Sequence, residues 1–117
     1  MQPRLRWNED YVDGEGSDVI RMLFERDWEP VADTGGYAAS KDLVAPPGTL
    51  LNYSSGTSNI VSRIVAGVVG PADEYDQWLR RELFGPLGME SASPRYDEVG
   101  TWIASSYCFC TVGDFAR

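Results

Sequence analysis

A tyrosine followed by two serines stands at the start of a long apolar run, in the stretch LNYSSGTSN from Leu51 to Asn59. Ahead of a helix, a phenol lies near unpaired backbone N–H groups and the positive end of the helix dipole, which favour an anion. Because its reference pKa is about 10, a phenol acts as a base only where cations or dipoles stabilise the phenolate. The local pattern therefore has two interpretations. Tyr53 is either a packed aromatic beside a capped helix, which local pattern alone favours, or a catalytic tyrosine.

The residue types that the chain lacks limit this chemistry. None of the 117 residues is a histidine, which excludes a Ser-His-Asp triad and a zinc site with histidine ligands. Lys41 is the single lysine. Cys108 and Cys110 have a spacing that is poor for a disulfide, and they are too few to hold a metal. We therefore interpret the cysteines as two small apolar side chains, and we expect no metal site.

Charge and composition narrow the class of partner. The formal net charge of −8 comes from 18 acidic and 10 basic residues, spread along the chain. This balance argues against nucleic acid and anionic membrane surfaces, since both favour a basic face. No apolar run is long enough to span a bilayer, and the N-terminal MQPRLRWNED lacks an apolar segment of the signal-peptide type. A hydrophobic content of 43% is enough for one packed domain.

Helical spacing dominates the first part of the chain. Ser17 is typical of an N-cap, and the apolar residues after it predict a helix over about 18–27. One helical turn is expected over 37–40, and a longer helix begins at Ser54 or Ser55. That helix carries an apolar stripe that we expect to be buried, formed by Ile60, Val61, Ile64, Val65 and Val68.

The second part predicts one more helix, a loop and a strand. Pro71 is typical of a first helical turn, and the helix after it should turn an apolar face inward. That face consists of Tyr75, Trp78, Leu79 and Leu83. We expect a loop over 91–100, a strand over 102–110 and a helix that Thr111 caps and that runs to the end of the sequence. The fold class is therefore mainly α, with one strand near the C-terminus.

Four stretches together resemble the serine β-lactamase-like hydrolases. The likeness is closest to class C β-lactamases, their esterase relatives and the 6-aminohexanoate-oligomer hydrolases, a group that also resembles penicillin-binding proteins. PPGTLLNYSSGTSNI is similar to the family segment P-G-x-x-x-x-Y-S-N or Y-S-S-x-x, and ELFGPLGM to its signature L-F-x-P-L-G-M. SSYCFCTVGDFAR resembles a strand-then-helix segment often written S-T-x-x-D-L-A-R-F. LRWNEDYVDGEGSDVI looks like the segment after L-L-x-M-x-S-G-L, and the order and distances agree along nearly the whole chain.

This resemblance implies roles for four residues. In the family, the serine of S-x-x-K is the nucleophile, its lysine takes part in activation, and a motif tyrosine relays the proton. By position, Tyr53 matches the motif tyrosine, and Ser55 stands where many members have a substrate-contacting asparagine. Ser106 and Tyr107 stand where many relatives have small residues that line the cleft, and they are candidates for shaping the acyl pocket.

The same resemblance shows which parts are missing. The residue three before Lys41 is Ala38, so S-x-x-K is absent, and neither K-T-G nor H-x-G occurs. We therefore expect residues 1–117 to form a single segment, the helical middle part of the β-lactamase/transpeptidase-like α+β fold. The implied function is a segment of a serine hydrolase that acts on a carboxylic ester or amide, including a β-lactam, through an acyl-serine intermediate. No cofactor is implied, and the chain alone should be inactive.

Two alternatives stay open. The first is a degenerate, non-catalytic module that folds alone and binds a partner or peptide, with apolar helix faces that invite self-association. The faces expected to be exposed carry Ile64, Val65, Val68, Trp78 and Leu79. The second is an unrelated small helical enzyme that pairs carboxylates for acid–base work, although solvated faces explain its acidic residues better. Its candidates are Asp10, Asp13, Glu15, Asp73, Glu74 and Asp76.

Overall fold

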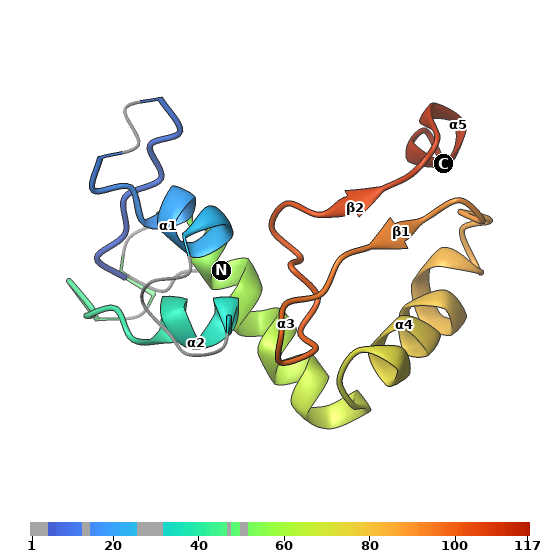
Figure 1. Cartoon of the computed structure of the whole chain (residues 1–117), viewed down its shortest axis with the longest axis horizontal. Coiled ribbons are helices and arrows are strands. Elements are labelled where there is room, and N and C mark those ends of the chain that lie inside the picture. The colour runs from blue at the N-terminus through green and yellow to red at the C-terminus, as the bar shows by residue number, and fades with distance from the viewer. Residues whose placement is uncertain (1–4, 13–14, 26–31, 47, 50–51) are drawn as a thin grey trace.

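The computed structural model describes residues 5–12, 15–25, 32–46, 48–49 and 52–117 (Figure 1). Its elements follow in the order α1 (Asp18–Phe24), α2 (Thr34–Ala39), α3 (Ser55–Val69), α4 (Asp73–Leu79), the π-helical turn η1 (Arg80–Phe84), β1 (Ser93–Pro94), β2 (Cys108–Phe109) and α5 (Val112–Phe115). This architecture confirms the prediction of a mainly helical chain with little strand. Among the described helices, none has the length and apolar content needed to cross a membrane.

Side-chain caps set where the helices begin. The Ser17 side chain accepts the N–H of Ile20 at the start of α1, and the Ser54 side chain accepts that of Thr57 at the start of α3, as the sequence predicts. The turn expected over 37–40 is α2, which starts earlier because Asp33 caps it. Glu25 is extended, so α1 ends before the predicted boundary; residues 26–27 lie outside the described residues.

The longest helix, α3, joins two groups of elements (Figure 1). Beside its N-terminal half, α1 and α2 enclose a buried cluster of Met22, Tyr37 and Ala38. At its other end, α4, η1 and the paired strands enclose a second cluster, formed by Ala66, Tyr75, Leu79, Phe84 and Ala92. Because the core is divided in this way, the radius of gyration of 15.0 Å exceeds the value of about 13 Å that is typical of a compact domain near this size.

The predicted apolar stripe of α3 is only partly buried. Ile60 and Val65 are half-buried and pack against the first and the second cluster, whereas Val61, Ile64 and Val68 are 46%, 64% and 82% exposed. The fully buried residues of α3 are small or polar, and they are Ser55, Gly56, Thr57, Asn59, Ser62 and Ala66. The prediction was therefore wrong for Val61, Ile64 and Val68, because α2 approaches α3 so closely that only short side chains fit between them.

Two glycines show how close that approach is. A Cβ atom on Gly56 of α3 would lie 2.9 Å from the Cβ of Ala38 in α2, and one on Gly35 of α2 would lie 2.7 Å from the Cβ of Arg63 in α3. Both distances are shorter than packed atoms allow. Val61, Ile64 and Val68 therefore remain on the outer face of α3.

The faces expected to be exposed divide into two groups. Ile64 and Val68 are exposed, as predicted, and Val65 and Trp78 are half-buried. Leu79 is only 2% exposed, which confirms its predicted place on the inward face of α4 and contradicts the exposure expected for a non-catalytic module. It is buried within the second cluster, with Phe84 and Tyr75.

The strand expected over 102–110 is shorter than predicted. Only Cys108–Phe109 forms a strand, and it pairs antiparallel with Ser93–Pro94, which lies in the stretch expected to be loop. A single bridge joins Tyr96 and Trp102 further along the same two segments. The final helix α5 ends at Phe115, before the end of the sequence.

The second cluster should carry much of the stability. Replacing Leu79 by Ala is expected to lower the free energy of unfolding by about 2–5 kcal/mol, because the deletion leaves a cavity in a packed core. Leu87→Ala is the matched control, since Leu87 is 44% exposed and its loss should change stability by less than about 0.5 kcal/mol. Urea denaturation followed by circular dichroism measures both, and equal losses would contradict the placement of this core.

Candidate functional site

Tyr53 immediately precedes Ser54, the N-cap of α3. Its side chain is 74% exposed, and its hydroxyl makes no hydrogen bond with the residues that the structure describes. It lies close enough to Tyr11 to influence the ionisation of that phenol. The helix is therefore capped as expected, while the aromatic ring beside it faces solvent and is not packed in the core.

Beside Tyr53, the carboxylate of Glu9 binds the first residue of α3. One carboxylate oxygen accepts the backbone N–H of Ser55 at 3.0 Å, and the other accepts the Ser55 hydroxyl. Ser55 is only 1% exposed, and its Oγ also lies 3.2 Å from the Tyr11 hydroxyl. The Ser55 hydroxyl, for which a substrate contact was predicted, is therefore buried and already hydrogen-bonded to Glu9.

Tyr11 completes this group with a second phenol. Its hydroxyl donates to Glu9 at 3.1 Å. Burial raises the pKa of Tyr11, the hydrogen bond between Tyr11 and Ser55 opposes the rise, and the acceptor and charge of Glu9 add to it. Tyr11 is therefore a neutral hydrogen-bond donor next to Tyr53 at physiological pH.

Sequence reasoning missed both Glu9 and Tyr11. Nothing in the local pattern around Glu9 indicates that its partner is Ser55, which follows Glu9 in the sequence only after α1 and α2. The resemblance of LRWNEDYVDGEGSDVI to a family segment was the one available signal.

A turn that contains Ser106 lies against α3. The fully buried Asn59 donates its amide to the Ser105 hydroxyl at 3.1 Å and accepts the Ser105 N–H at 3.4 Å. Asn59 lies about one turn after Ser55, so this pair anchors the segment beside the helix that follows Tyr53. Ser106 is exposed, with its Oγ 3.1 Å from that of Ser105. Its hydroxyl is thus accessible.

Tyr107 takes a different direction. Its half-buried ring stacks on Phe109 with centroids 6.1 Å apart, and its carbonyl accepts the indole N–H of Trp102 and the N–H of Arg95. Among the described residues, no hydrogen bond joins Ser106 or Tyr107 to Tyr53. The structure therefore brings Ser55 and Tyr53 together and leaves Tyr107 with the paired strands.

The single lysine is engaged away from this group. Lys41 Nζ lies 2.6 Å from Asp18 Oδ1 and 4.3 Å from the centre of the Tyr37 ring. Asp18 also accepts the Tyr37 hydroxyl and the N–H of Asn8. Burial would raise the pKa of Asp18, but the hydrogen bond and charge of Lys41 outweigh it, so the pKa is lowered. Lys41 thus ties α1 to α2.

Among the described residues, both cysteines and the acidic candidates Asp10 and Asp76 are in settings that disfavour a second reactive site. Both cysteines are half-buried, and burial together with Cys110 raises the pKa of the Cys108 thiol, which disfavours the reactive thiolate. Asp10 accepts the N–H of Val12, and Asp76 pairs with Arg80 at 2.6 Å. Asp13 lies outside the described residues. Across the described chain, no three His, Cys, Asp or Glu residues gather as metal ligands.

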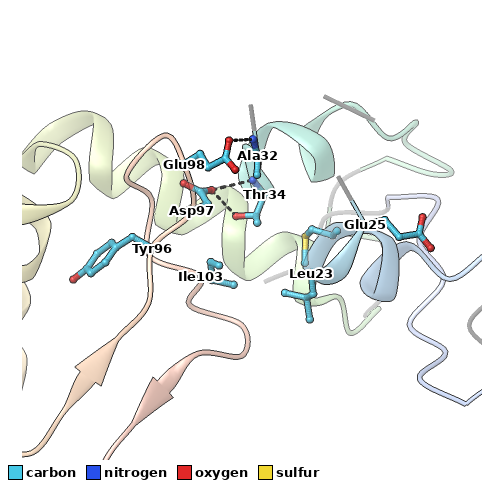
Figure 2. Close-up of a pocket in the computed structure, with 9 residues that line it drawn as sticks. Leu23, Glu25, Ala32, Thr34, Tyr96, Asp97, Glu98 and Ile103 are labelled. Carbon is cyan, nitrogen blue, oxygen red and sulfur yellow. Dashed lines mark hydrogen bonds between the residues drawn. The ribbon is translucent and has the colours of Figure 1, made fainter. Parts of the chain in front are cut away.

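A small pocket lies between α1, the start of α2 and the 96–103 loop (Figure 2). Its volume is about 130 Å³. Asp97 accepts the N–H and hydroxyl of Thr34, each at 2.9 Å, and Glu98 accepts the N–H of Ala32 at 3.1 Å. Figure 2 shows these contacts along one side of the pocket. Because both carboxylates already hold two segments together, the pocket has a structural role.

A larger apolar groove, of about 450 Å³, lies between α3 and α4. It is lined by Ser58, Val61, Ser62, Val65, Tyr75, Trp78, Leu79, Glu82, Leu83, Trp102 and Ala104. Ser62 donates its hydroxyl to the Trp102 carbonyl at 2.6 Å and lies 3.0 Å from the Tyr75 hydroxyl. With few polar groups directed into it, the groove offers contact surface rather than acid–base chemistry.

Comparison with known proteins gives one match. The family model described as Beta-lactamase matches residues 5–100. This range includes Glu9, Tyr11, Tyr53 and Ser55, and excludes Ser106 and Tyr107. No curated protein and no solved structure matches the chain.

The contact between Asp18 and Lys41 predicts a specific pH dependence. Asp18→Asn should lower the free energy of unfolding at pH 7 by about 1.5–3 kcal/mol, the range for hydrogen bonds to charged groups. A depressed folded-state pKa stabilises the protein above the unfolded-state value of 3.8. That stabilisation is lost as the pH falls through the folded-state value.

Urea denaturation between pH 7 and pH 3 tests this dependence. The difference between the wild type and Asp18→Asn should shrink over the acid end of the range. Glu90→Gln removes an exposed carboxylate and serves as the control. A difference that stays constant with pH would contradict the assignment.

Proposed function

This chain belongs to the beta-lactamase family, and from that premise we propose that it is a segment of a serine hydrolase in which Tyr53 relays the proton during acyl transfer. The substrate class is a carboxylic ester or amide, including a β-lactam. The observation that carries the proposal is the exposed phenol of Tyr53 at the N-terminus of α3, in the position of the family's motif tyrosine. The family match is what excludes an unrelated small enzyme built on paired carboxylates.

The proposed chemistry has two steps, acylation and deacylation. In acylation a serine oxygen attacks the substrate carbonyl, the serine proton passes to the Tyr53 oxygen, and the proton of the Tyr53 hydroxyl passes to the leaving alcohol or amine as its bond to the carbonyl carbon breaks. In deacylation water attacks the acyl-serine ester, the carboxylic acid leaves, and a water proton returns to the serine oxygen through the Tyr53 hydroxyl in the same way. Tyr53 needs an exposed hydroxyl for this relay, which is how the structure presents it.

The other candidate residues fit this scheme unequally. Ser106 is exposed on the turn that Asn59 holds against α3, so its hydroxyl is accessible to an acyl group. Tyr107 follows Ser106 in the chain, so its segment would border the acyl pocket beside Ser106. Ser55 is less available to substrate, because its hydroxyl is bonded to Glu9. We therefore assign the substrate contacts mainly to Ser106.

No activity is proposed for this chain alone. Its sequence holds no S-x-x-K, and Lys41 is paired with Asp18 at 2.6 Å. Tyr53 has no proton to relay unless a nucleophilic serine and its activating lysine are supplied from elsewhere.

One observation favours a second function. The outer face of α3 exposes Val61, Ile64 and Val68. A non-catalytic module of the same family could bind a partner or a second copy through this apolar face. In that case neither Tyr53 nor an added nucleophile would matter for function.

Hydrolysis of p-nitrophenyl acetate separates the two functions. We expect no turnover above buffer from the folded chain alone. The chain joined to a family segment that carries S-x-x-K should hydrolyse the ester. Tyr53→Phe should then lower kcat by about 100-fold or more, the usual loss when a general acid–base group is removed.

Tyr96→Phe is the matched control, because the Tyr96 hydroxyl bonds Asp76 on α4, near the opposite end of α3. Turnover by the chain alone that falls in Tyr53→Phe would refute the need for an added serine. Equal activity of Tyr53→Phe and wild type in the joined protein would refute the role of Tyr53. A folded joined protein without turnover would support the non-catalytic module.

A further inference from the structure

We propose that Glu9 is a positioning residue for Tyr53, which it holds through the first turn of α3. This inference rests on the proposed role of Tyr53. Glu9 does not touch the reacting atoms in this scheme. It instead fixes the position of Ser55, which lies two residues after Tyr53 in the chain.

The carboxylate of Glu9 has a full set of donors. One oxygen accepts the indole N–H of Trp7 and the backbone N–H of Ser55. The other accepts the hydroxyls of Tyr11 and Ser55. Four donors from three residues converge on one side chain, and charge-assisted hydrogen bonds of this kind are about twice as strong as neutral ones. The geometry is therefore that of a built site rather than a chance surface contact.

This arrangement does more than cap the helix. Ser54 already caps α3 by accepting the N–H of Thr57 at 3.2 Å. Glu9 instead takes the N–H of Ser55, a donor that the cap leaves unpaired, and places a negative charge at the positive end of the helix dipole. Since Ser55 is held at both its backbone and its hydroxyl, the chain two residues after Tyr53 has little freedom to move.

Donor and acceptor can be assigned in the hydrogen bonds between the hydroxyls of Ser55 and Tyr11 and the Glu9 carboxylate. The Ser55 hydroxyl donates its only proton to Glu9, so it can only accept from Tyr11. The Tyr11 proton is shared between Ser55 at 3.2 Å and Glu9 at 3.1 Å. The Tyr11 hydroxyl is therefore held in one orientation by two members of this group.

Trp7 fixes the same turn from a second side. Its ring packs so closely on Gly56 that a Cβ atom there would lie 2.6 Å away. Its indole N–H is bonded to Glu9. Loss of the Glu9 carboxylate would thus release Trp7, Tyr11 and Ser55 together, and all three lie next to the segment that carries Tyr53.

Glu9→Gln tests the inference in this chain without any catalytic assay. The substitution keeps the size and one acceptor oxygen but removes the charge. In NMR spectra, we expect the Ser55 amide proton to move upfield and the ring carbons of Tyr53 to shift and broaden. The pKa of Tyr11 should fall, because the Glu9 charge helps to raise it. Glu15→Gln, an equal charge change at an exposed residue of the same segment, should leave these signals in place.

The outcomes separate this inference from the proposed function. Tyr53 ring signals that stay unchanged while the Ser55 amide moves would overturn it, since Glu9 would then serve only as a cap. In an active joined hydrolase, Glu9→Gln should lower kcat by about tenfold with little change in KM, because positioning acts on the chemical step. An unchanged kcat would also overturn the inference. If the joined protein is inactive but Tyr53 still responds to Glu9→Gln, the proposed function fails and the positioning contact stands.

Discussion

The close contact between α2 and the small-residue face of α3 is the constraint on which the rest of the structure depends. Gly35 and Gly56 let the two backbones approach to distances that no larger residue allows. Arg63 on α3 then reaches the Asp33 cap of α2 at 2.9 Å. Because short side chains fill this interface, several apolar residues of α3 turn outward, and its polar residues become the inner face.

Buried polar side chains on that inner face connect segments that are far apart in the sequence. Asn59 holds Ser105, and Ser62 holds the carbonyl of Trp102. Asp97 in turn binds the N–H and hydroxyl of Thr34 at the start of α2. Hydrogen bonds of this kind are directional, and leaving a buried polar group without its partner is costly. They therefore select one packing of these segments, whereas a small divided apolar core alone would allow several. The scaffold of the candidate site is therefore polar in character.

The candidate site combines that scaffold with one exposed reactive group. Tyr53 is presented to solvent at the N-terminus of α3, while Glu9, Tyr11 and Ser55 are bonded to one another beneath it. The single lysine contributes to the scaffold through Asp18 and not to the site. In the proposed function, this segment would supply the relaying phenol and its support, and other residues would supply the nucleophile.

The sequence by itself determined that the chain is mainly helical, three of its helix caps and the family. Ser17 and Ser54 predict helix starts because capping is a local interaction between a side chain and an N–H three residues away. The motif around Tyr53 likewise lies within a few residues. The face of α3 that is buried could not be predicted, because periodicity marks the apolar side of a helix but not the glycines of a neighbouring helix that decide which side fits. The contact of Glu9 with Ser55 was also decided only by the tertiary structure. It joins residues that are 46 positions apart, and such a pair meets only after α1 and α2 have packed against α3.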